Sequence, residues 1–311
     1  MVKGNLCRFF TADGLELQGF FASPGEGVAP TTLVHIHGLS GNFYENRFLD
    51  QVAEGVVGRG LNFFSFNNRG HDYFADFLCQ DPGTGRYSYE QIGGAYEAFE
   101  DCVPDLDAAL QFVSSVGSER VVLQGHSHGA LKAVYYLFRA QRPQVVGLSL
   151  LSPSDDLGVR RAQLEDGFEL ALAEAKRLVD SGRPTQLLAP GYFEYPISVA
   201  TYLNSFGEGS ALGLFNLSRT DREAFPELRS MAVPVLLVVG TFNEAFLGDP
   251  GDYVAAARAE LTNAAAVTDH IIAGAPHNYL GFEQELTKTI VTWLADRSEM
   301  AGDDRRSCDP S

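Results

Sequence analysis

The sequence has few of the features that mark extracellular, membrane or zinc-binding proteins. Only four cysteines occur in 311 residues, Cys7, Cys79, Cys102 and Cys308, and no two form a CxxC pair. This spacing favours neither a disulfide scaffold nor a zinc site. No run of roughly 18 apolar residues is available to span a bilayer. The first residues, MVKGNLCRFF, lack the apolar segment and cleavage site of a signal peptide, so we expect a cytoplasmic protein.

Basic residues are also scarce. The chain has 23 Lys and Arg against 40 Asp and Glu, which gives a formal net charge of −17. Such a surface repels phosphate backbones and anionic lipid, so we expect neither a nucleic-acid nor a membrane partner. High net charge of this kind ordinarily serves solubility. The sequence does not indicate an oligomeric state.

Internal repeats are absent, and short strand-like runs instead alternate with helical ones. Residues 6–22 read as a hairpin that turns at Asp13–Gly14. Residues 120–125 and 144–152 are continuous apolar runs of the kind buried in parallel sheets. Alternation of strands and helices predicts an α/β fold with a mostly parallel central sheet and helices on both faces.

The alternation stops at about residue 154 and resumes at about residue 231. We therefore predict a core made of residues 1–153 and 231–299, a helical insertion at 154–230, and a flexible tail at 300–311. Ligands bind at the carboxyl ends of strands in open α/β sheets. The insertion is thus well placed to form a lid over that end.

The stretch VVLQGHSHG, residues 121–129, sets a serine at the end of an apolar strand. Glycines flank Ser127 two positions before and two positions after, and a helical pattern follows. A turn sharp enough to lift the hydroxyl above the sheet brings strand and helix too close for side chains at Gly125 and Gly129. We interpret Ser127 as a nucleophile; the alternative is an ordinary turn with a capping serine.

Four motifs in this order resemble those of the α/β-hydrolase superfamily over nearly the whole chain. They are HIHGLSG (35–41), FNNRGHDY (66–73), GHSHG (125–129) and GAPHNYLG (274–281). The resemblance implies the α/β-hydrolase fold, mostly parallel and carrying a helical lid insertion. The text around GNFYENRF and NNRGHDY is also similar to a branch with fungal siderophore esterases and uncharacterised bacterial relatives.

The resemblance further implies roles for residues outside the serine motif. His277 follows the nucleophile in chain order, as the base of this fold does. The backbone N–H groups of Leu39 and His128 are expected to form the oxyanion hole. The remaining histidines fit packing, loop or edge positions, and no helical HxxxH pattern suggests a metal site.

The acid is less well defined. Members of the superfamily usually carry aspartate where this chain has Asn243, and asparagine supports a catalytic histidine poorly. Glu244 is the favoured replacement, Asp155 or Asp156 after the preceding strand is the alternative, and Asp249 or no acid is left open.

Candidate substrate-binding residues are His37 and Ser40 in the first loop, and Tyr192 and Tyr195 in the insertion. The insertion is rich in aromatic residues, which either line an apolar pocket or pack between insertion and sheet. They are Phe168, Tyr192, Phe193, Tyr195, Tyr202 and Phe206.

These residues together predict a serine hydrolase that cleaves an ester, lactone or thioester through an acyl-enzyme, with a small-molecule acyl substrate and no metal or organic cofactor. Two alternatives are kept. One is acyl transfer or cyclisation in secondary metabolism, in which water is excluded. The other is a catalytically silent ligand-binding protein on the same fold, to which Asn243 gives some weight.

Overall fold

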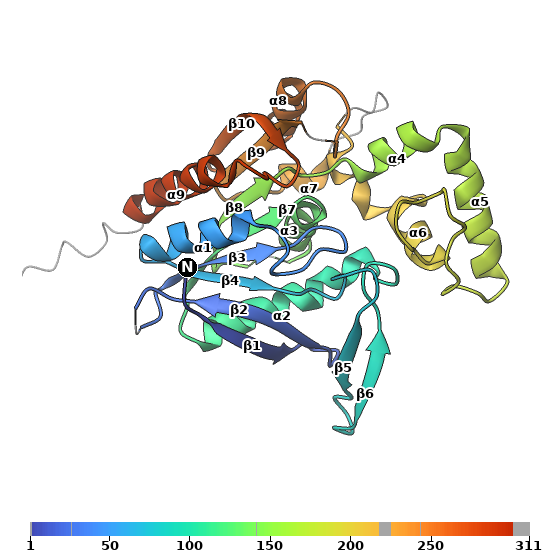
Figure 1. Ribbon diagram of the computed structural model, residues 1–311, viewed down its shortest axis with the longest axis horizontal. Helices are drawn as coiled ribbons and strands as arrows, with labels where there is room; N and C mark the ends of the chain where they lie inside the picture. The colour runs from blue at the N-terminus through green and yellow to red at the C-terminus, as the bar shows by residue number, and fades with distance from the viewer. Residues whose placement is uncertain (1, 26, 141, 218–224, 243, 301–311) are drawn as a thin grey trace, which may run out of the picture.

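A computed structural model gives the fold and describes residues 2–25, 27–140, 142–217, 225–242 and 244–300 (Figure 1). Within these residues an eight-stranded sheet has the order β1-β2-β4-β3-β7-β8-β9-β10. The strands are β1 (Asn5–Phe10), β2 (Glu16–Ala22), β3 (Thr31–Ile36), β4 (Asn62–Phe66), β7 (Arg120–His126), β8 (Val145–Leu151), β9 (Val235–Phe242) and β10 (Val267–Pro276). The six strands from β4 to β10 run parallel, and β2 pairs antiparallel with both β1 and β4. The predicted N-terminal hairpin and mostly parallel sheet are confirmed.

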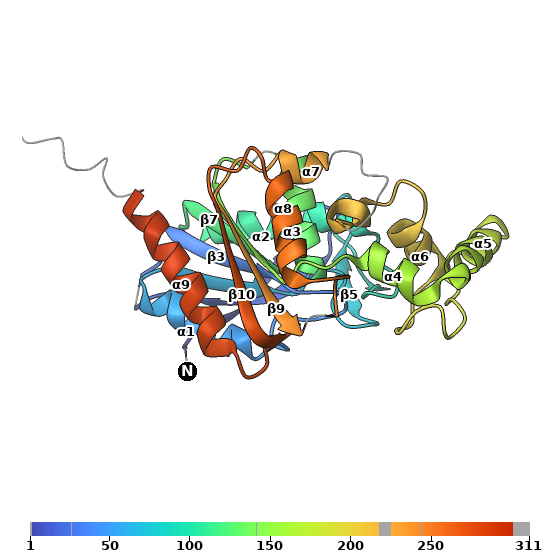
Figure 2. The same cartoon turned by 90° about the horizontal axis from the view of Figure 1, so that it is seen from above.

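Helices cover both faces of this sheet (Figure 2). One face packs against α1 and α9, and the other against α2, α3 and α8. Their bounds are α1 (Phe48–Gly58), α2 (Cys102–Ser115), α3 (His128–Arg139), α8 (Pro250–Glu260) and α9 (Glu283–Met300). The two apolar layers explain why the central strands read as continuous hydrophobic runs. In the described part of the chain, no helix is both long and apolar enough to cross a bilayer.

The insertion between β8 and β9 is helical. It consists of α4 (Asp156–Leu164), α5 (Asp166–Asp180), α6 (Val199–Phe206), the 3₁₀ helix η2 (Ala211–Phe215) and α7 (Pro226–Arg229). Figure 1 shows α4, α5 and α6 beyond the carboxyl ends of the parallel strands. The insertion therefore stands at the edge where strand-end loops converge.

Two elements differ from the sequence expectation. A second, two-stranded sheet of β5 (Asp76–Gln80) and β6 (Tyr87–Gln91) was not predicted, because every residue of β6 is exposed and alternation of buried and exposed positions is lost. The apolar periodicity of residues 95–116 predicts one helix, but the α-helix begins only at Cys102, after the 3₁₀ turn η1 (Phe99–Asp101). Pro104 then falls in the first turn of α2, where its missing N–H costs nothing.

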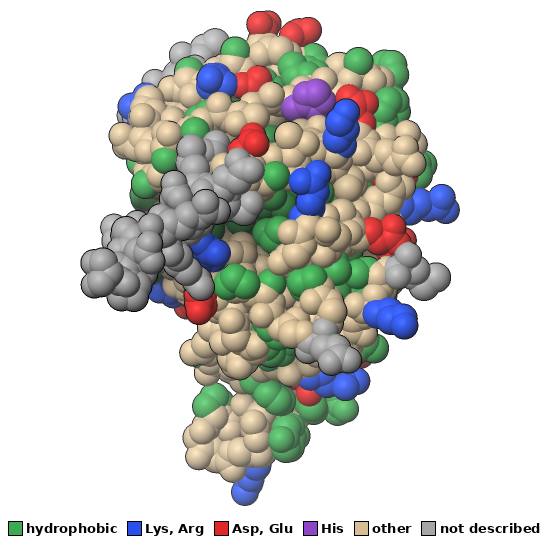
Figure 3. Space-filling view, turned by 90° about the vertical axis from the view of Figure 1, so that its left-hand side faces the viewer, with side chains coloured by type: hydrophobic (Ala, Val, Ile, Leu, Met, Phe, Trp, Pro, Cys, Tyr) green, Lys and Arg blue, Asp and Glu red, His purple; other side chains and the backbone are tan. Residues whose placement is uncertain are grey.

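Figure 3 shows one face of the molecular surface. Acidic, basic and apolar side chains are interspersed there. Of the predicted tail, residues 301–311 lie outside the described residues, and Cys308 is among them.

Candidate active site

The junction of β7 and α3 holds Ser127 in a strained backbone conformation. Its φ is 56° and its ψ is −127°, a region that residues other than glycine rarely adopt. A Cβ on Gly125 would lie 2.3 Å from the carbonyl oxygen of Gly129, and one on Gly129 would lie 2.3 Å from that of Ile36. Close approach of helix to strand therefore requires both glycines, for the reason the sequence suggested.

This turn sets the partly exposed Ser127 side chain at the amino end of α3. The Ser127 N–H donates to the carbonyl of Leu151 at 2.9 Å, which ties the turn to β8. The first N–H groups of a helix have no partner within it and carry the positive end of the helix dipole. They can stabilise negative charge that develops on an oxygen next to Ser127.

The loop after β3 lies against Ser127. A Cβ added to Gly38 would be 3.1 Å from the Ser127 Cβ and 3.6 Å from its Oγ, so the loop backbone borders the hydroxyl. Beneath it, Asn68 N–H donates to His37 Nε2 at 3.1 Å, which leaves His37 Nδ1 to donate to the Gly38 carbonyl at 2.8 Å. These bonds hold the loop, and Leu39 lines the cavity beside it.

The loop after β10 carries His277 and is anchored by Tyr279. The buried Tyr279 hydroxyl donates to the carbonyl of Val238 at 2.9 Å and accepts from the Ser152 hydroxyl at 2.7 Å. His126 Nε2 donates to the His277 carbonyl at 2.9 Å, and the two rings lie 4.9 Å apart. The residue before the serine thus holds the histidine loop in place.

Burial keeps the imidazoles near the elbow neutral. It lowers the pKa of His277 to about 4, against an opposing effect of the Asp156 charge. It also lowers the pKa values of His35 and His126 to about 3. At pH 7 the His277 ring is therefore unprotonated and able to accept a proton.

His128, directly after the serine, is paired with an acid of the insertion. Its Nδ1 donates to Asp156 Oδ2 at 2.8 Å. Burial raises the pKa of Asp156, but the hydrogen bond from His128, the nearby Ser154 hydroxyl and the nearby imidazoles together more than offset this, and the pKa stays below its ordinary value. Asp156 is therefore ionised at neutral pH and joins the first turn of α4 to the elbow.

The acids that the sequence offered lie in different places. Asn243 falls outside the described residues. Glu244 is exposed at the cavity and hydrogen-bonds to no other described residue. Asp249 caps α8 and does not line the cavity.

Asp155 and Asp156 are adjacent in the sequence but make different contacts. Asp155 is buried and accepts from the Gly158 N–H at 2.9 Å, which caps α4. Asp156 lines the cavity, and among the described carboxylates it is the one whose charge raises the pKa of His277.

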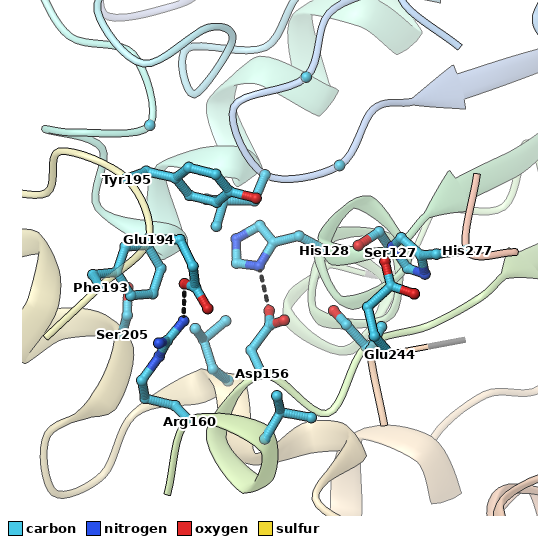
Figure 4. A pocket seen from close by; sticks show the side chains of 18 of the residues that line it. Ser127, His128, Asp156, Arg160, Phe193, Glu194, Tyr195, Ser205, Glu244 and His277 are labelled. Atoms are coloured by element: carbon cyan, nitrogen blue, oxygen red, sulfur yellow. Dashed lines mark hydrogen bonds and ion pairs between the residues drawn. The ribbon is translucent and has the colours of Figure 1, made fainter. Parts of the chain in front are cut away.

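All of these loops border one cavity of about 560 Å³ (Figure 4). In the close-up, Ser127, His277 and Glu244 appear at one end, and Arg160 and Tyr195 at the other. Within the described chain, no group of three or more His, Cys, Asp or Glu side chains is placed to hold a metal.

The predicted substrate-contact residues divide between the cavity and its supports. Tyr195 lines the cavity, whereas His37, Ser40 and Tyr192 do not. His37 is fully buried with both ring nitrogens bonded, so its role is to position the loop rather than to touch substrate.

The aromatic residues of the insertion serve both expected purposes. Phe193, Tyr195 and Phe206 line the cavity, whereas Phe168 and Tyr202 are buried in the packing of the insertion.

Sequence reasoning missed an ion pair below the loop after β3. Lys132 of α3 is 1% exposed and its Nζ donates to Glu97 Oε2 at 2.6 Å and to Asn68 Oδ1 at 3.0 Å. A lysine on an otherwise apolar helix, in ALKAVYYLF, was the available signal.

Comparison with known proteins adds the following. Residues 33–288 match the alpha/beta hydrolase family. The fold is similar to the siderophore hydrolase EstB from Aspergillus fumigatus, with a TM-score of 0.68 and 15% identity over 95% of this chain and 98% of that one. It is also similar to Est1E from Butyrivibrio proteoclasticus with bound ferulic acid, at a TM-score of 0.63 and 16% identity over 93% and 98%. A carboxyl esterase from Bacillus coagulans gives a TM-score of 0.65 and 11% identity over 95% of this chain and 99% of that one. These likenesses establish the fold, and no curated protein matches the sequence significantly.

Proposed function

The chain belongs to the alpha/beta hydrolase family, and on that premise we propose that it is a serine hydrolase acting on a carboxylic ester, lactone or thioester. The strained conformation of Ser127 is the observation that carries the proposal. Strain of this kind persists where the surroundings enforce it and where it serves a function. Here the Gly38 backbone and the His277 loop border the same cavity as the strained serine.

In the proposed mechanism, Ser127 Oγ attacks the carbonyl carbon and its proton passes to His277. The N–H groups of Leu39 and His128 stabilise the resulting oxyanion. The intermediate collapses as His277 gives its proton to the leaving group, which leaves an acyl group on Ser127. Water, deprotonated by His277, then attacks the acyl-enzyme, and His277 returns that proton to Ser127 Oγ as the carboxylic acid is released. No cofactor takes part in these steps.

For the third member of the triad we favour Asp156 on its charge, which acts on His277 from a distance, since its carboxylate faces His128 and bonds to it (Figure 4). Its charge raises the pKa of His277 and so stabilises the imidazolium that forms in the reaction. Glu244, which the sequence favoured, lines the cavity but is exposed to solvent, where its charge is screened more strongly. Asp155 is engaged as a helix cap.

We further propose that residues 154–230 act as a lid and that Phe193, Tyr195 and Phe206 bound the pocket for the acyl group. The cavity extends from Ser127 to these aromatic side chains, which supports the assignment. Mixed aromatic and polar walls are typical of sites for small organic ligands.

The test is the hydrolysis of p-nitrophenyl esters, lactones and thioesters by matched variants. Ser127→Ala and His277→Ala are expected to lower kcat by about 10⁴- to 10⁶-fold. Asp156→Asn should lower kcat more than Glu244→Gln does, because it removes the charge that stabilises the His277 imidazolium. Asp249→Asn is the control, because this cap lies away from the cavity.

Three outcomes would overturn parts of this proposal. Unchanged activity in Ser127→Ala would remove the nucleophile assignment. A large loss in Glu244→Gln with little in Asp156→Asn would exchange the two acids. An acyl-enzyme that accumulates in water and is discharged only by an added alcohol would make the reaction an acyl transfer.

A further inference from the structure

We propose that the His128 side chain is a specificity determinant that accepts a hydrogen bond from a hydroxyl group in the acyl part of the substrate. This inference rests on the proposed function, since it assumes that an acyl group is carried on Ser127. It assigns the side chain a task separate from that of the His128 backbone N–H.

The ring is held in one orientation and one tautomer. Asp156 accepts from Nδ1 at 2.8 Å, and Phe99 packs edge to face against the ring with centroids 5.2 Å apart. With Nδ1 carrying the proton, Nε2 of the neutral ring is an acceptor. Nε2 has no hydrogen-bond partner among the described residues, and His128 lines the cavity.

Figure 4 shows where this nitrogen lies. The imidazole projects from the elbow toward the insertion, and the nitrogen not bonded to Asp156 faces the part of the cavity near Tyr195 and Glu194. The residue is 4% exposed, but Nε2 itself reaches the cavity and has no partner among the described residues, so a ligand donor can bond to it directly. Nε2 is thus placed to accept a hydrogen bond from a polar group of a bound molecule.

The direction of the substrate follows from the proposed chemistry. His277 must protonate the leaving group, so the leaving group lies on its side of Ser127. In Figure 4, His128 and the insertion lie on the other side of Ser127 from His277. The acyl chain therefore runs past His128 toward the insertion.

The basic side chains at that end of the cavity are already paired, so an anionic group on the substrate would find no free cation among the described residues there. The Arg160 guanidinium bonds to Glu194 and lies over the Phe193 ring at 4.3 Å. Lys132 pairs with Glu97, another lining residue. A neutral donor fits this environment better than a charged group, which would need a partner of its own. A hydroxyl is the simplest such donor on an acyl chain.

If the His128 side chain only tied α4 to the elbow, the preference for a hydroxy ester would not depend on Nε2. Two variants distinguish this structural role from the proposed one. His128→Asn offers an amide near the position of Nδ1, so it can still bond Asp156 but cannot reach as far as Nε2. His128→Gln reaches the Nε2 position. His270→Asn is the control, since His270 is an exposed residue of β10 bonded to Glu285 and does not line the cavity.

The experiment compares kcat/KM for p-nitrophenyl hexanoate with that for its 2-, 3- and 6-hydroxy analogues. Ratios of hydroxylated to plain ester are used, because they cancel any change in the oxyanion hole. We expect the native protein to prefer at least one hydroxy ester by about 3- to 10-fold, the effect of one hydrogen bond. His128→Asn should bring this ratio near one, His128→Gln should retain part of it, and His270→Asn should retain all of it.

The inference is overturned if the native protein prefers no hydroxy ester, or if the preference survives in His128→Asn. Labelling of Ser127 by a fluorophosphonate, run in parallel, separates this failure from that of the proposed function. A labelled protein without hydroxyl preference loses only the inference. A folded protein that neither labels nor hydrolyses any ester loses both.

Discussion

Replacing Lys132 with methionine tests the buried ion pair that lies below the loop after β3. The ammonium group is 1% exposed and contacts the carboxylate of Glu97, which is 4% exposed, and the side-chain oxygen of Asn68. Asn68 in turn donates its backbone N–H to His37. Methionine keeps most of the lysine volume but leaves the Glu97 charge buried without its partner.

Removing one partner of a buried ion pair costs about 3–5 kcal/mol. In a chain of this size each kcal/mol corresponds to about 2 °C in Tm, so a fall of about 6–10 °C is expected. Adding Glu97→Gln should recover much of the loss, because no charge then remains buried. Lys176→Met, in an exposed pair with Asp180, should cost less than about 1 kcal/mol.

Urea unfolding and thermal melts followed by circular dichroism measure these differences at pH 7. A loss no larger than that of Lys176→Met would refute the reasoning. So would a double variant, Lys132→Met with Glu97→Gln, as unstable as the sum of its single changes.

Two further outcomes follow from the elbow and its histidines. Gly129→Ala should cost about 1–3 kcal/mol in urea unfolding, because its Cβ would lie 2.3 Å from the Ile36 carbonyl oxygen, whereas Gly58→Ala, with open space around it, should be nearly neutral. Burial lowers the pKa of His277 to about 4 and that of His126 to about 3, so unfolded chains bind more protons below pH 6.5. The contribution of each such ring to the free energy of unfolding should be complete above pH 6.5 and should fall by about 1.4 kcal/mol per pH unit toward pH 4. Urea unfolding curves that coincide at pH 7 and pH 5 would contradict this. The acidic limb of kcat/KM should likewise lie below pH 6.5.

The central strands could be predicted because burial on both faces leaves a local signature. VVLQG and VVGLSLL are mostly apolar with one polar residue each, and each is followed by a helical pattern. The β5–β6 hairpin has no such signature, since the side chains of β6 point into solvent. Its strands are defined by pairing with each other, which a pattern within one segment does not reveal.

The site divides along the same line. Ser127 and His277 stand at positions that strand, turn and helix signals mark locally. The pairing of His128 with Asp156 joins residues 28 positions apart and depends on how α4 starts. Lys132 and Glu97, 35 positions apart, meet only after α3 packs beside the segment between β6 and η1. Side-chain partners of this kind are set by tertiary packing, so the sequence pointed to the reactive groups but not to what holds them.

The most direct test of the central claim is reaction of the folded protein with a fluorophosphonate, read by intact mass and peptide mapping. The expected result is one phosphonyl group per chain on Ser127, absent in Ser127→Ala and formed far more slowly in His277→Ala. A folded native protein that stays unlabelled, or labelling that persists in Ser127→Ala, would contradict an activated serine at the β7–α3 elbow.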